Sequence, residues 1–262
     1  MRIVVLVKEV PDTWGSRELD LETGLLKRAA GEPVLDEVCE RALEVALSYA
    51  DVADCEVVAL SLAPGSAEAT VRKALALGAH EAVMVVDEAL IGADLGLTAI
   101  ALAEALKRSG FDLVVAGNRS TDGGGGVLPS MIAELLDVPH LTQLGALEIS
   151  DGSVSGDRFS DDAIISVSAE LPAVVSITDQ LPEARFPDFK STMAAKKKPL
   201  SKYSLADLDI ALDHHVVPRA IMLDVSSRPP RDAGVTIVDE GDAGARLAQF
   251  LRLGGFVTKA ES

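Results

Sequence analysis

The sequence predicts an α/β protein built on a doubly wound, mostly parallel β-sheet, followed by an extended C-terminal arm. Short apolar runs alternate with segments that carry apolar residues at helical spacing, the pattern of a parallel sheet covered by helices. Apolar residues make up 48% of the chain and aromatic residues only 3%, so the core must be mainly Ala, Val and Leu. The 262 residues suffice for one large domain with an extension.

The first half of the chain alternates strands with helices. The expected strands are 3–7, 56–62, 81–86 and 113–116, and the expected helices are 36–50, 67–77, 94–109 and 127–136. Asp36 has the side chain of an N-cap, and Gly78 stands where a glycine ends a helix. Residues 12–28 are polar and predict a loop or small hairpin.

The second half is less regular. Residues 146–168 alternate in polarity around short turns, which predicts antiparallel strands joined to the sheet, and residues 173–177 return to the core. Beyond residue 198 only a short helix at 205–209 and an amphipathic helix at 241–253 are expected. A lone terminal helix cannot bury its apolar face, so we expect a domain of residues 1–198 and an arm, 199–262, that packs on a partner chain.

Composition and charge narrow the classes of function that are open to this chain. The net charge of −17 disfavours binding to nucleic acid or to an anionic membrane. No signal-peptide pattern and no apolar run of 18 residues occurs, so we expect a cytoplasmic protein that does not insert into a membrane. Cys39 and Cys55 are too few for a disulfide framework, and His214 and His215 have no metal-ligand partners at the right spacing, so no metal site is expected.

A glycine-rich loop between a predicted strand and a predicted helix is the strongest candidate for a ligand site. Four successive glycines, Gly123 to Gly126, let backbone N–H groups approach an anion, and the following helix points its positive end at the same place. Asn118, Ser120 and Thr121 add polar side chains. A nucleotide phosphate is the natural ligand, although the loop is neither a Rossmann fingerprint nor a Walker A sequence.

No catalytic set accompanies this loop, because no His, Cys, Ser and Asp residues form a recognisable triad. A nucleotide pocket without visible chemistry indicates a cofactor-bearing subunit, not an enzyme that turns over its own substrate. A strand at 171–178 runs into a Pro-containing loop with exposed aromatic residues and three lysines. Such a loop on a rigid strand suits docking to another protein.

Four segments carry a resemblance to one family. They are 1–12 (containing Ile-Val-Val-Leu-Val-Lys-Glu-Val-Pro-Asp), 70–79 (Thr-Val-Arg-Lys-Ala-Leu-Ala-Leu-Gly-Ala), the loop 117–131, and 171–178 (Leu-Pro-Ala-Val-Val-Ser-Ile-Thr) with 185–198. Over almost its whole length the chain resembles the β subunit of electron transfer flavoprotein, of a bacterial type. The resemblance implies an adenine-nucleotide-hydrolase-like fold.

The resemblance also implies a heterodimer with an α subunit that holds most of one FAD, while the β subunit covers one side of the isoalloxazine and binds a structural AMP. Electrons would arrive from flavin dehydrogenases of the acyl-CoA type, as in fatty acid oxidation, and leave to a quinone oxidoreductase. Whether AMP or a second FAD fills the β pocket stays open. Either Thr13 or Trp14 would face the flavin.

The resemblance assigns two groups of residues. Those expected to bind cofactor are Leu6, Lys8, Asp36, Leu62, Ala63, Asn118, Ser120, Thr121, Asp122, Gly123, Gly124, Gly125, Gly126, Val127 and Leu128. Those expected to dock a partner are Phe189, as the anchor of a recognition loop at 183–198, with Met193, Lys196, Lys197 and Lys198. Arg119 stands where relatives often have Gln, and Val127-Leu128-Pro129 where they have Gln-Thr/Val-Gly, so phosphate contacts would come from backbone amides.

Two alternatives belong to other classes. An adenine-nucleotide sensor of the universal-stress type shares the strand, glycine loop and helix, but does not need the Phe189 loop or the arm. An adenylating enzyme of the PP-loop kind should carry Ser-Gly-Gly-x-Asp-Ser after the first strand, where this chain has Lys-Glu-Val-Pro at 8–11.

Overall fold

The computed structural model describes residues 1–28, 31–211, 218–231, 233–234, 236 and 238–257. The chain divides into two compact units, Met1–Val225 and Ser226–Ser262. Within the described part of the chain, no helix is long and apolar enough to cross a membrane.

The first unit is built on a seven-stranded sheet whose order is β12-β5-β4-β1-β6-β11-β7. All neighbours in this sheet are parallel. The strands are β1 Arg2–Leu6, β4 Glu56–Leu62, β5 Glu81–Val85, β6 Leu113–Gly117, β7 His140–Leu144, β11 Ala173–Ile177 and β12 Leu200–Tyr203. The predicted doubly wound α/β class is therefore confirmed.

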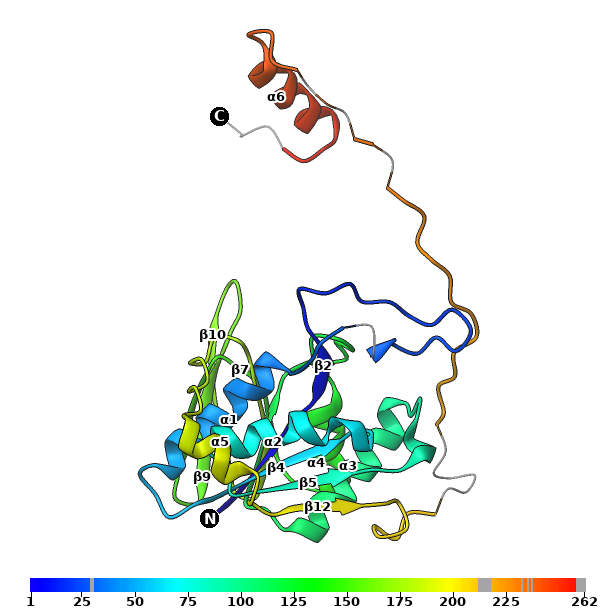
Figure 1. The fold of residues 1–262 in the computed structure, drawn as a ribbon. Coiled ribbons are helices and arrows are strands. Elements are labelled where there is room, and N and C mark those ends of the chain that lie inside the picture. The colour runs from blue at the N-terminus through cyan, green and yellow to red at the C-terminus, as the bar shows by residue number, and fades with distance from the viewer. Residues whose placement is uncertain (29–30, 212–217, 232, 235, 237, 258–262) are drawn as a thin grey trace. The chain divides into compact units, whose positions relative to one another are not determined.

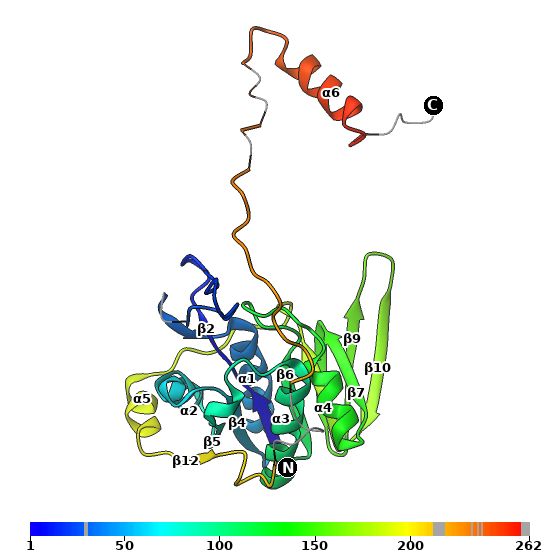
Figure 2. The ribbon, with the colours of Figure 1, turned by 90° about the vertical axis from the view of Figure 1, so that its right-hand side faces the viewer.

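Helices cover both faces of this sheet (Figures 1 and 2). The helices are α1 Glu37–Ala50, α2 Glu68–Leu77 and α5 Phe189–Ala195 on one side, and α3 Leu95–Ser109 and α4 Leu128–Leu136 on the other. Strand β1 contributes side chains to the cores on both faces of the sheet. Ile3 and Val5 belong to the core with α1 and α2, and Val4 belongs to the core with α3 and α4. This continuous burial explains why the strand reads as an unbroken apolar run.

The predicted helix ends are confirmed. The Asp36 side chain caps α1 by accepting the Val38 N–H at 3.1 Å. Gly78 ends α2 with a φ of 145°, and a Cβ there would lie 2.9 Å from Leu47 Cδ2. Only glycine satisfies both the backbone angle and the space. Two short 3₁₀ turns, Gly65–Ala67 and Glu88–Leu90, follow β4 and β5.

The antiparallel strands expected in residues 146–168 are present, but they form a sheet of their own. This sheet has the order β10-β9-β8, with β8 Ala146–Ser150, β9 Ser153–Phe159 and β10 Ile164–Glu170. It connects to the main sheet through Gly145, whose N–H donates to the Asp157 carbonyl at 2.8 Å. A two-stranded antiparallel pair, β2 Glu9–Pro11 with β3 Pro33–Leu35, follows β1.

Three expectations for the C-terminal third were wrong. Residues 189–195, expected in a loop, form α5, because Asp188 caps them by accepting the Ser191 N–H at 2.6 Å. Residues 205–209 form turns instead of a helix. The sheet continues beyond residue 198, because β12 pairs with β5, so the first unit runs to Val225.

The second unit contains the predicted amphipathic helix as α6 Ala243–Leu253. No residue of α6 is buried, and Leu247, Phe250 and Leu253 are exposed. The rings of Phe250 and Phe256 lie 6.4 Å apart and stack.

Candidate functional site

A cavity of about 990 Å³ lies beyond the carboxyl ends of β1, β4, β5 and β6. The chain moves outward from β1 through β4 to β5 and then returns to β6 on the other side of β1. Such a reversal of strand order leaves a crevice between the loops that follow the two central strands. The glycine-rich loop follows β6 and Lys8 follows β1, so both border this crevice.

Most of the residues predicted to bind cofactor line this cavity. They are Leu6, Lys8, Leu62, Ala63, Asn118, Ser120, Gly123, Gly125, Gly126 and Leu128. The other predicted residues, Asp36, Thr121, Asp122, Gly124 and Val127, are not among its lining residues. Of these, Asp36, Thr121 and Asp122 support the loop through hydrogen bonds and do not line the cavity.

Apolar residues that the sequence analysis did not assign form the opposite wall. Leu25, Leu90, Ile91 and Leu95 line the cavity together with the predicted Leu62. Leu25 comes from the loop after β2, Leu90 and Ile91 from the segment between β5 and α3, and Leu95 is the first residue of α3. The one available signal was the presence of Leu and Ile in otherwise polar loops. The cavity thus has an apolar wall on one side and a polar loop on the other.

The glycine loop offers free backbone donors. The Gly123 N–H is used by Asp122 and the Gly124 N–H by the Ser120 carbonyl, at 2.6 and 3.0 Å. Within the described residues, the N–H groups at positions 125–128 have no acceptor, and they stand where α4 begins. Gly126 has a φ of 69°, which favours glycine. Free amides at a helix N-terminus form an anion site.

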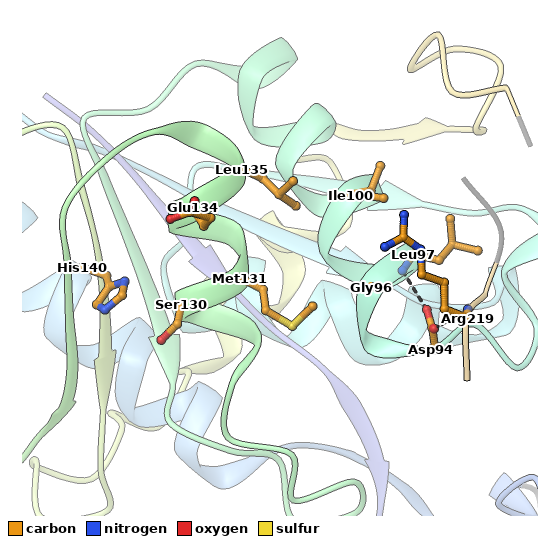
Figure 3. Close-up of a pocket in the computed structure, with 10 residues that line it drawn as sticks. All are labelled: Asp94, Gly96, Leu97, Ile100, Ser130, Met131, Glu134, Leu135, His140 and Arg219. Atoms are coloured by element: carbon orange, nitrogen blue, oxygen red, sulfur yellow. Dashed lines mark hydrogen bonds between the residues drawn. The ribbon is translucent and has the colours of Figure 1, made fainter. Parts of the chain in front are cut away.

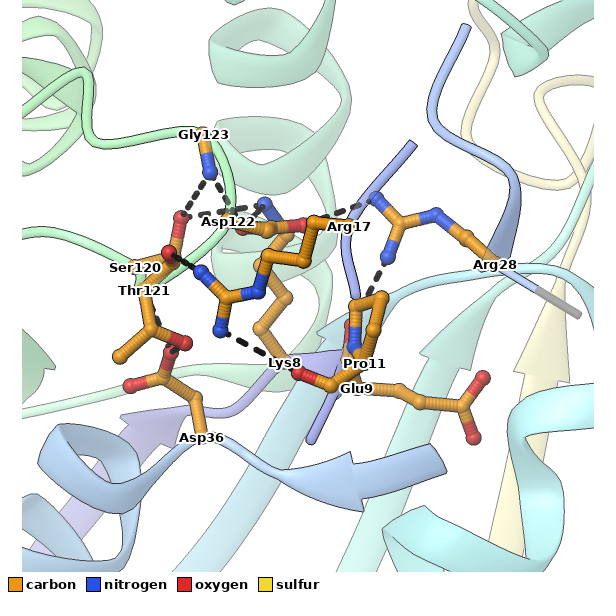
Figure 4. A network of polar contacts seen from close by, with 10 residues as sticks. All are labelled: Lys8, Glu9, Pro11, Arg17, Arg28, Asp36, Ser120, Thr121, Asp122 and Gly123. Carbon is orange, nitrogen blue, oxygen red and sulfur yellow. Dashed lines mark hydrogen bonds and ion pairs between the residues drawn. The ribbon is translucent and has the colours of Figure 1, made fainter. Parts of the chain in front are cut away.

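Asp122 supports this loop through an ion-pair network (Figure 4). Its nearly buried carboxylate accepts hydrogen bonds from Lys8 Nζ at 2.7 Å and Arg28 Nη2 at 3.0 Å. Burial alone would raise the pKa of Asp122, but the hydrogen bonds from Lys8, Ser120 and the Gly123 N–H, together with the positive charge of Lys8, outweigh it and lower the pKa well below its usual range. The carboxylate therefore stays charged and holds Lys8 beside the cavity.

Asp36 fastens the same loop to the start of α1. One carboxylate oxygen of this fully buried residue caps the helix, and the other accepts the Thr121 N–H at 2.7 Å and the Thr121 hydroxyl at 2.9 Å. Arg17 donates to the Thr121 carbonyl from the other side. Asp36, Thr121 and Asp122 thus shape the loop, and the contacts to a ligand are left to the residues that face the cavity.

The predicted docking residues cluster on and beside α5. Phe189 is the first residue of this helix and is 82% exposed, and Met193, Lys196 and Lys197 are also exposed. The sequence analysis did not single out Phe186, which is almost fully exposed three residues before Phe189. Two exposed phenylalanines so close together on one surface are unusual for a protein that stays alone.

Lys198 differs from its neighbours. Its ammonium donates to the carbonyls of Leu75, Gly78 and Ala79 at 3.0, 3.2 and 2.6 Å, and partial burial lowers the pKa of Lys198. A cation at the C-terminal end of α2 satisfies carbonyls that have no helical partner. Lys198 therefore anchors the end of the α5 segment to α2. We expected its ammonium to face a partner, but it faces the carbonyls at the end of α2.

Arg185 fixes the segment that precedes α5. Its guanidinium donates to both carboxylate oxygens of Glu44 at 2.9 Å and to Asp51 Oδ2 at 2.8 Å. Burial alone would raise the pKa of Glu44, but these hydrogen bonds lower it. Arg41, also on α1, donates to the Leu181 carbonyl. Helix α1 thus holds the glycine loop at its start and the docking segment along its length.

Thr13 and Trp14 are both exposed in the loop after β2, and the Trp14 N–H donates to Asp12 Oδ1 at 2.9 Å. His214 and His215, for which no metal was expected, lie outside the described residues.

Fold and cavity together define a doubly wound α/β protein with a glycine-loop cavity at its strand reversal and an exposed phenylalanine at the start of α5. Comparison with known proteins identifies the family. A family model described as "Electron transfer flavoprotein domain" matches residues 23–208. The chain is 42% identical to electron transfer flavoprotein subunit beta of Mycobacterium leprae, covering 95% of this chain and 97% of that one. It is 30% identical to the same subunit of Syntrophomonas wolfei, covering 96% of each chain, and 29% identical to that of Bacillus subtilis, covering 96% and 98%.

The chain therefore belongs to the electron transfer flavoprotein family, and its relatives are β subunits. This confirms the resemblance seen in the sequence. Membership implies an electron carrier associated with a flavin, and a β subunit implies an α-subunit partner. The comparisons give no support to the alternatives of a universal-stress sensor or a PP-loop enzyme.

Proposed function

We propose that this chain is the β subunit of a heterodimeric electron transfer flavoprotein that passes electrons from flavin dehydrogenases of the acyl-CoA type, through FAD, to a quinone oxidoreductase. The observation that carries this proposal is the combination, in one chain of this family, of a cavity with free amides and an exposed aromatic helix. The first suits a bound nucleotide and the second suits a protein partner.

The proposed occupant of the cavity is AMP. Its phosphate would lie against the free N–H groups at 125–128, where the dipole of α4 adds positive potential. Lys8, held in place by Asp122, borders the same end of the cavity and offers a positive charge. The base would lie against the apolar wall that contains Leu62 and Ile91. Since the loop makes these contacts through its backbone, Arg119 in place of Gln does not remove them.

FAD would be held mainly by the α subunit and would supply the electron-carrying chemistry. The contribution of this chain would be a wall on one side of the flavin ring. Trp14 suits this role, because its indole is exposed and its loop is held by the hydrogen bond to Asp12. A planar aromatic side chain can stack on a flavin ring, which Thr13 cannot do.

Docking of the dehydrogenase would use the exposed surface of Phe186, Phe189 and Met193, with Lys196 and Lys197 at its edge. Aromatic residues on a rigid support make strong binding contacts, and the two lysines favour an acidic partner. The α subunit would bind the exposed apolar residues of α6, which find no cover within their own compact unit.

The proposal is tested on the complex of this chain with its α subunit. Under anaerobic conditions, an acyl-CoA dehydrogenase with its substrate should reduce the bound flavin, seen as bleaching of its absorbance near the visible maximum. A complex that contains flavin but is not reduced by any acyl-CoA dehydrogenase would contradict the assigned donor class. A complex without flavin would contradict the electron-transfer function as a whole.

A further inference from the structure

Residues 218–222, which lie far along the sequence from the glycine loop, are fastened to one rim of its cavity. The N–H groups of Arg219 and Ala220 donate to Asp94 Oδ2 at 2.7 and 3.0 Å. The other oxygen of Asp94 caps α3 by accepting the Leu97 N–H at 2.9 Å. Figure 3 draws Arg219 beside Asp94 at the start of α3. Because Asp94 also lines the glycine-loop cavity, these residues are attached to its wall.

The same segment also contacts the loop that follows β2, through Met222. A Cβ on Gly24 would lie 2.6 Å from Met222 Cγ and 2.7 Å from its Cε, so the methionine packs directly on the glycine. Gly24 also has a φ of 70°, a backbone conformation that side chains disfavour. Segment 218–222 therefore runs from the α3 side of the cavity to the loop that follows β2.

The next residue after Gly24, Leu25, lies against the turn before α3. Leu25 lines the cavity, and its Cδ2 atom lies 3.5 Å from the position of a Cβ on Gly92, in the turn before α3. On the other side, Arg28 ties the same loop to Asp122 of the glycine loop at 3.0 Å. We call residues 20–25 together with 218–222 the rim strap.

The rim strap is held by few contacts. The side chains of Leu25 and Met222 remain 39% and 57% exposed, so moving them uncovers little additional apolar surface. The hydrogen bonds to Asp94 come from backbone groups that water can also satisfy. A segment with this little burial opens at a much lower free energy than the sheet beneath it. By contrast, the glycine loop is fixed from below by Asp36 and Asp122.

We propose that the rim strap is the gate of the nucleotide cavity, which adenine nucleotide enters and leaves only when Met222 lifts from Gly24 and Leu25 leaves Gly92. This inference rests on the proposed function, because it requires a nucleotide in the cavity. It assigns a role to two segments that do not belong to the phosphate loop. The strap controls the rates of binding and release, while the glycine loop controls the affinity.

A reversible cross-link tests the gate in the complex with the α subunit. In the double variant Gly24→Cys, Met222→Cys, a sulfur at 222 would stand near Met222 Cγ, within disulfide reach of a Cβ at 24. Release of radiolabelled AMP from the oxidised complex should be slower by about tenfold or more, and a reductant should restore it. Equal release rates before and after reduction, with the disulfide verified by mass spectrometry, would overturn the proposal.

Single substitutions give an independent readout. Met222→Ala should speed AMP release by about fivefold, because the contact with Gly24 is lost, whereas Met222→Leu should stay close to the original rate. Unchanged release in Met222→Ala would also overturn the gate. If the purified complex holds no adenine nucleotide, the proposed function fails and the gate with it. If AMP is bound but its release ignores the strap, the gate fails alone.

Discussion

Phe189 provides the sharpest test of the docking surface. Its side chain is 82% exposed at the start of α5, so its removal should leave the fold of this chain intact. A phenylalanine buries about 200 Å² when covered, and 82% of that is about 160 Å². At about 25 cal/mol per Å², full burial against a partner is worth at most about 4 kcal/mol. A hot-spot residue at an interface usually contributes at least about 2 kcal/mol to the free energy of binding.

Phe189→Ala should therefore lower kcat/KM for reduction by the dehydrogenase by about 30-fold or more, the factor that corresponds to about 2 kcal/mol. The assay is anaerobic flavin bleaching of the αβ complex at varied dehydrogenase concentration. Val52→Ala is the matched control, because Val52 is 85% exposed but lies in the turn between α1 and β4. That variant should react at the original rate.

Two results would refute this reasoning. An unchanged kcat/KM in Phe189→Ala would remove the residue from the docking surface. Failure of the variant to assemble with the α subunit would move it to the interface between the subunits instead.

Three further predictions follow from the contacts around the glycine loop and α1. Arg185→Leu removes the bonds to Glu44 and Asp51, so kcat/KM for the dehydrogenase should fall while the nucleotide content, measured by mass spectrometry, stays unchanged. A loss of nucleotide would show that the bonds of Arg185 do not act on docking alone. Gly126→Val should empty the cavity of AMP, because φ is 69° and the added side chain crowds the amides, whereas Gly152→Val, at a φ of 82° in the turn between β8 and β9, should retain AMP; equal AMP content in both variants would contradict the loop assignment. Asp122→Asn should lower the free energy of unfolding at pH 7 by about 2 kcal/mol. Because the folded-state pKa of Asp122 is lowered, its contribution is complete above the unfolded-state pKa of about 4 and is lost progressively as pH falls from there through the lowered folded-state pKa, so urea titrations should show the difference between the two proteins shrinking in acid; a difference that stays at its neutral-pH value down to the lowest pH at which the protein is folded would contradict the charged network.

The sheet was predictable because its central strands are buried on both faces. Val4 has Val58 and Val114 as its neighbours in the sheet, and all three are fully buried, so the strands read as apolar runs. The caps Asp36 and Gly78 were predictable as well, since each acts within a few residues of its own position.

Elements that depend on distant partners were missed. Strand β12 is an edge strand in which Ser201 and Lys202 are exposed, so it shows no apolar run. Helix α5 has only seven residues and is stabilised by packing on α2 and by the bonds of Lys198 to the end of that helix. Neither source of stability can be read from local periodicity.

In the candidate site, too, the features that depend on neighbouring residues were predictable from the sequence, and those that depend on distant residues were not. The glycine loop and the cavity beyond the strands followed from sequence, because glycine runs and strand ends are local signals. The role of Asp122 did not follow, since its partners Arg28 and Lys8 are 94 and 114 residues away. The apolar wall of Leu25 and Ile91 forms only when two loops meet in space.

The most direct test of the central claim is a nucleotide count on the purified αβ complex. After denaturation, mass spectrometry and absorbance should find one FAD and one AMP for each complex, and Gly126→Val should keep the FAD but lose the AMP. Two FAD and no AMP would assign a flavin to the cavity in place of AMP. A complex without adenine nucleotide beyond the flavin would contradict the claim that the glycine-loop cavity is a nucleotide site.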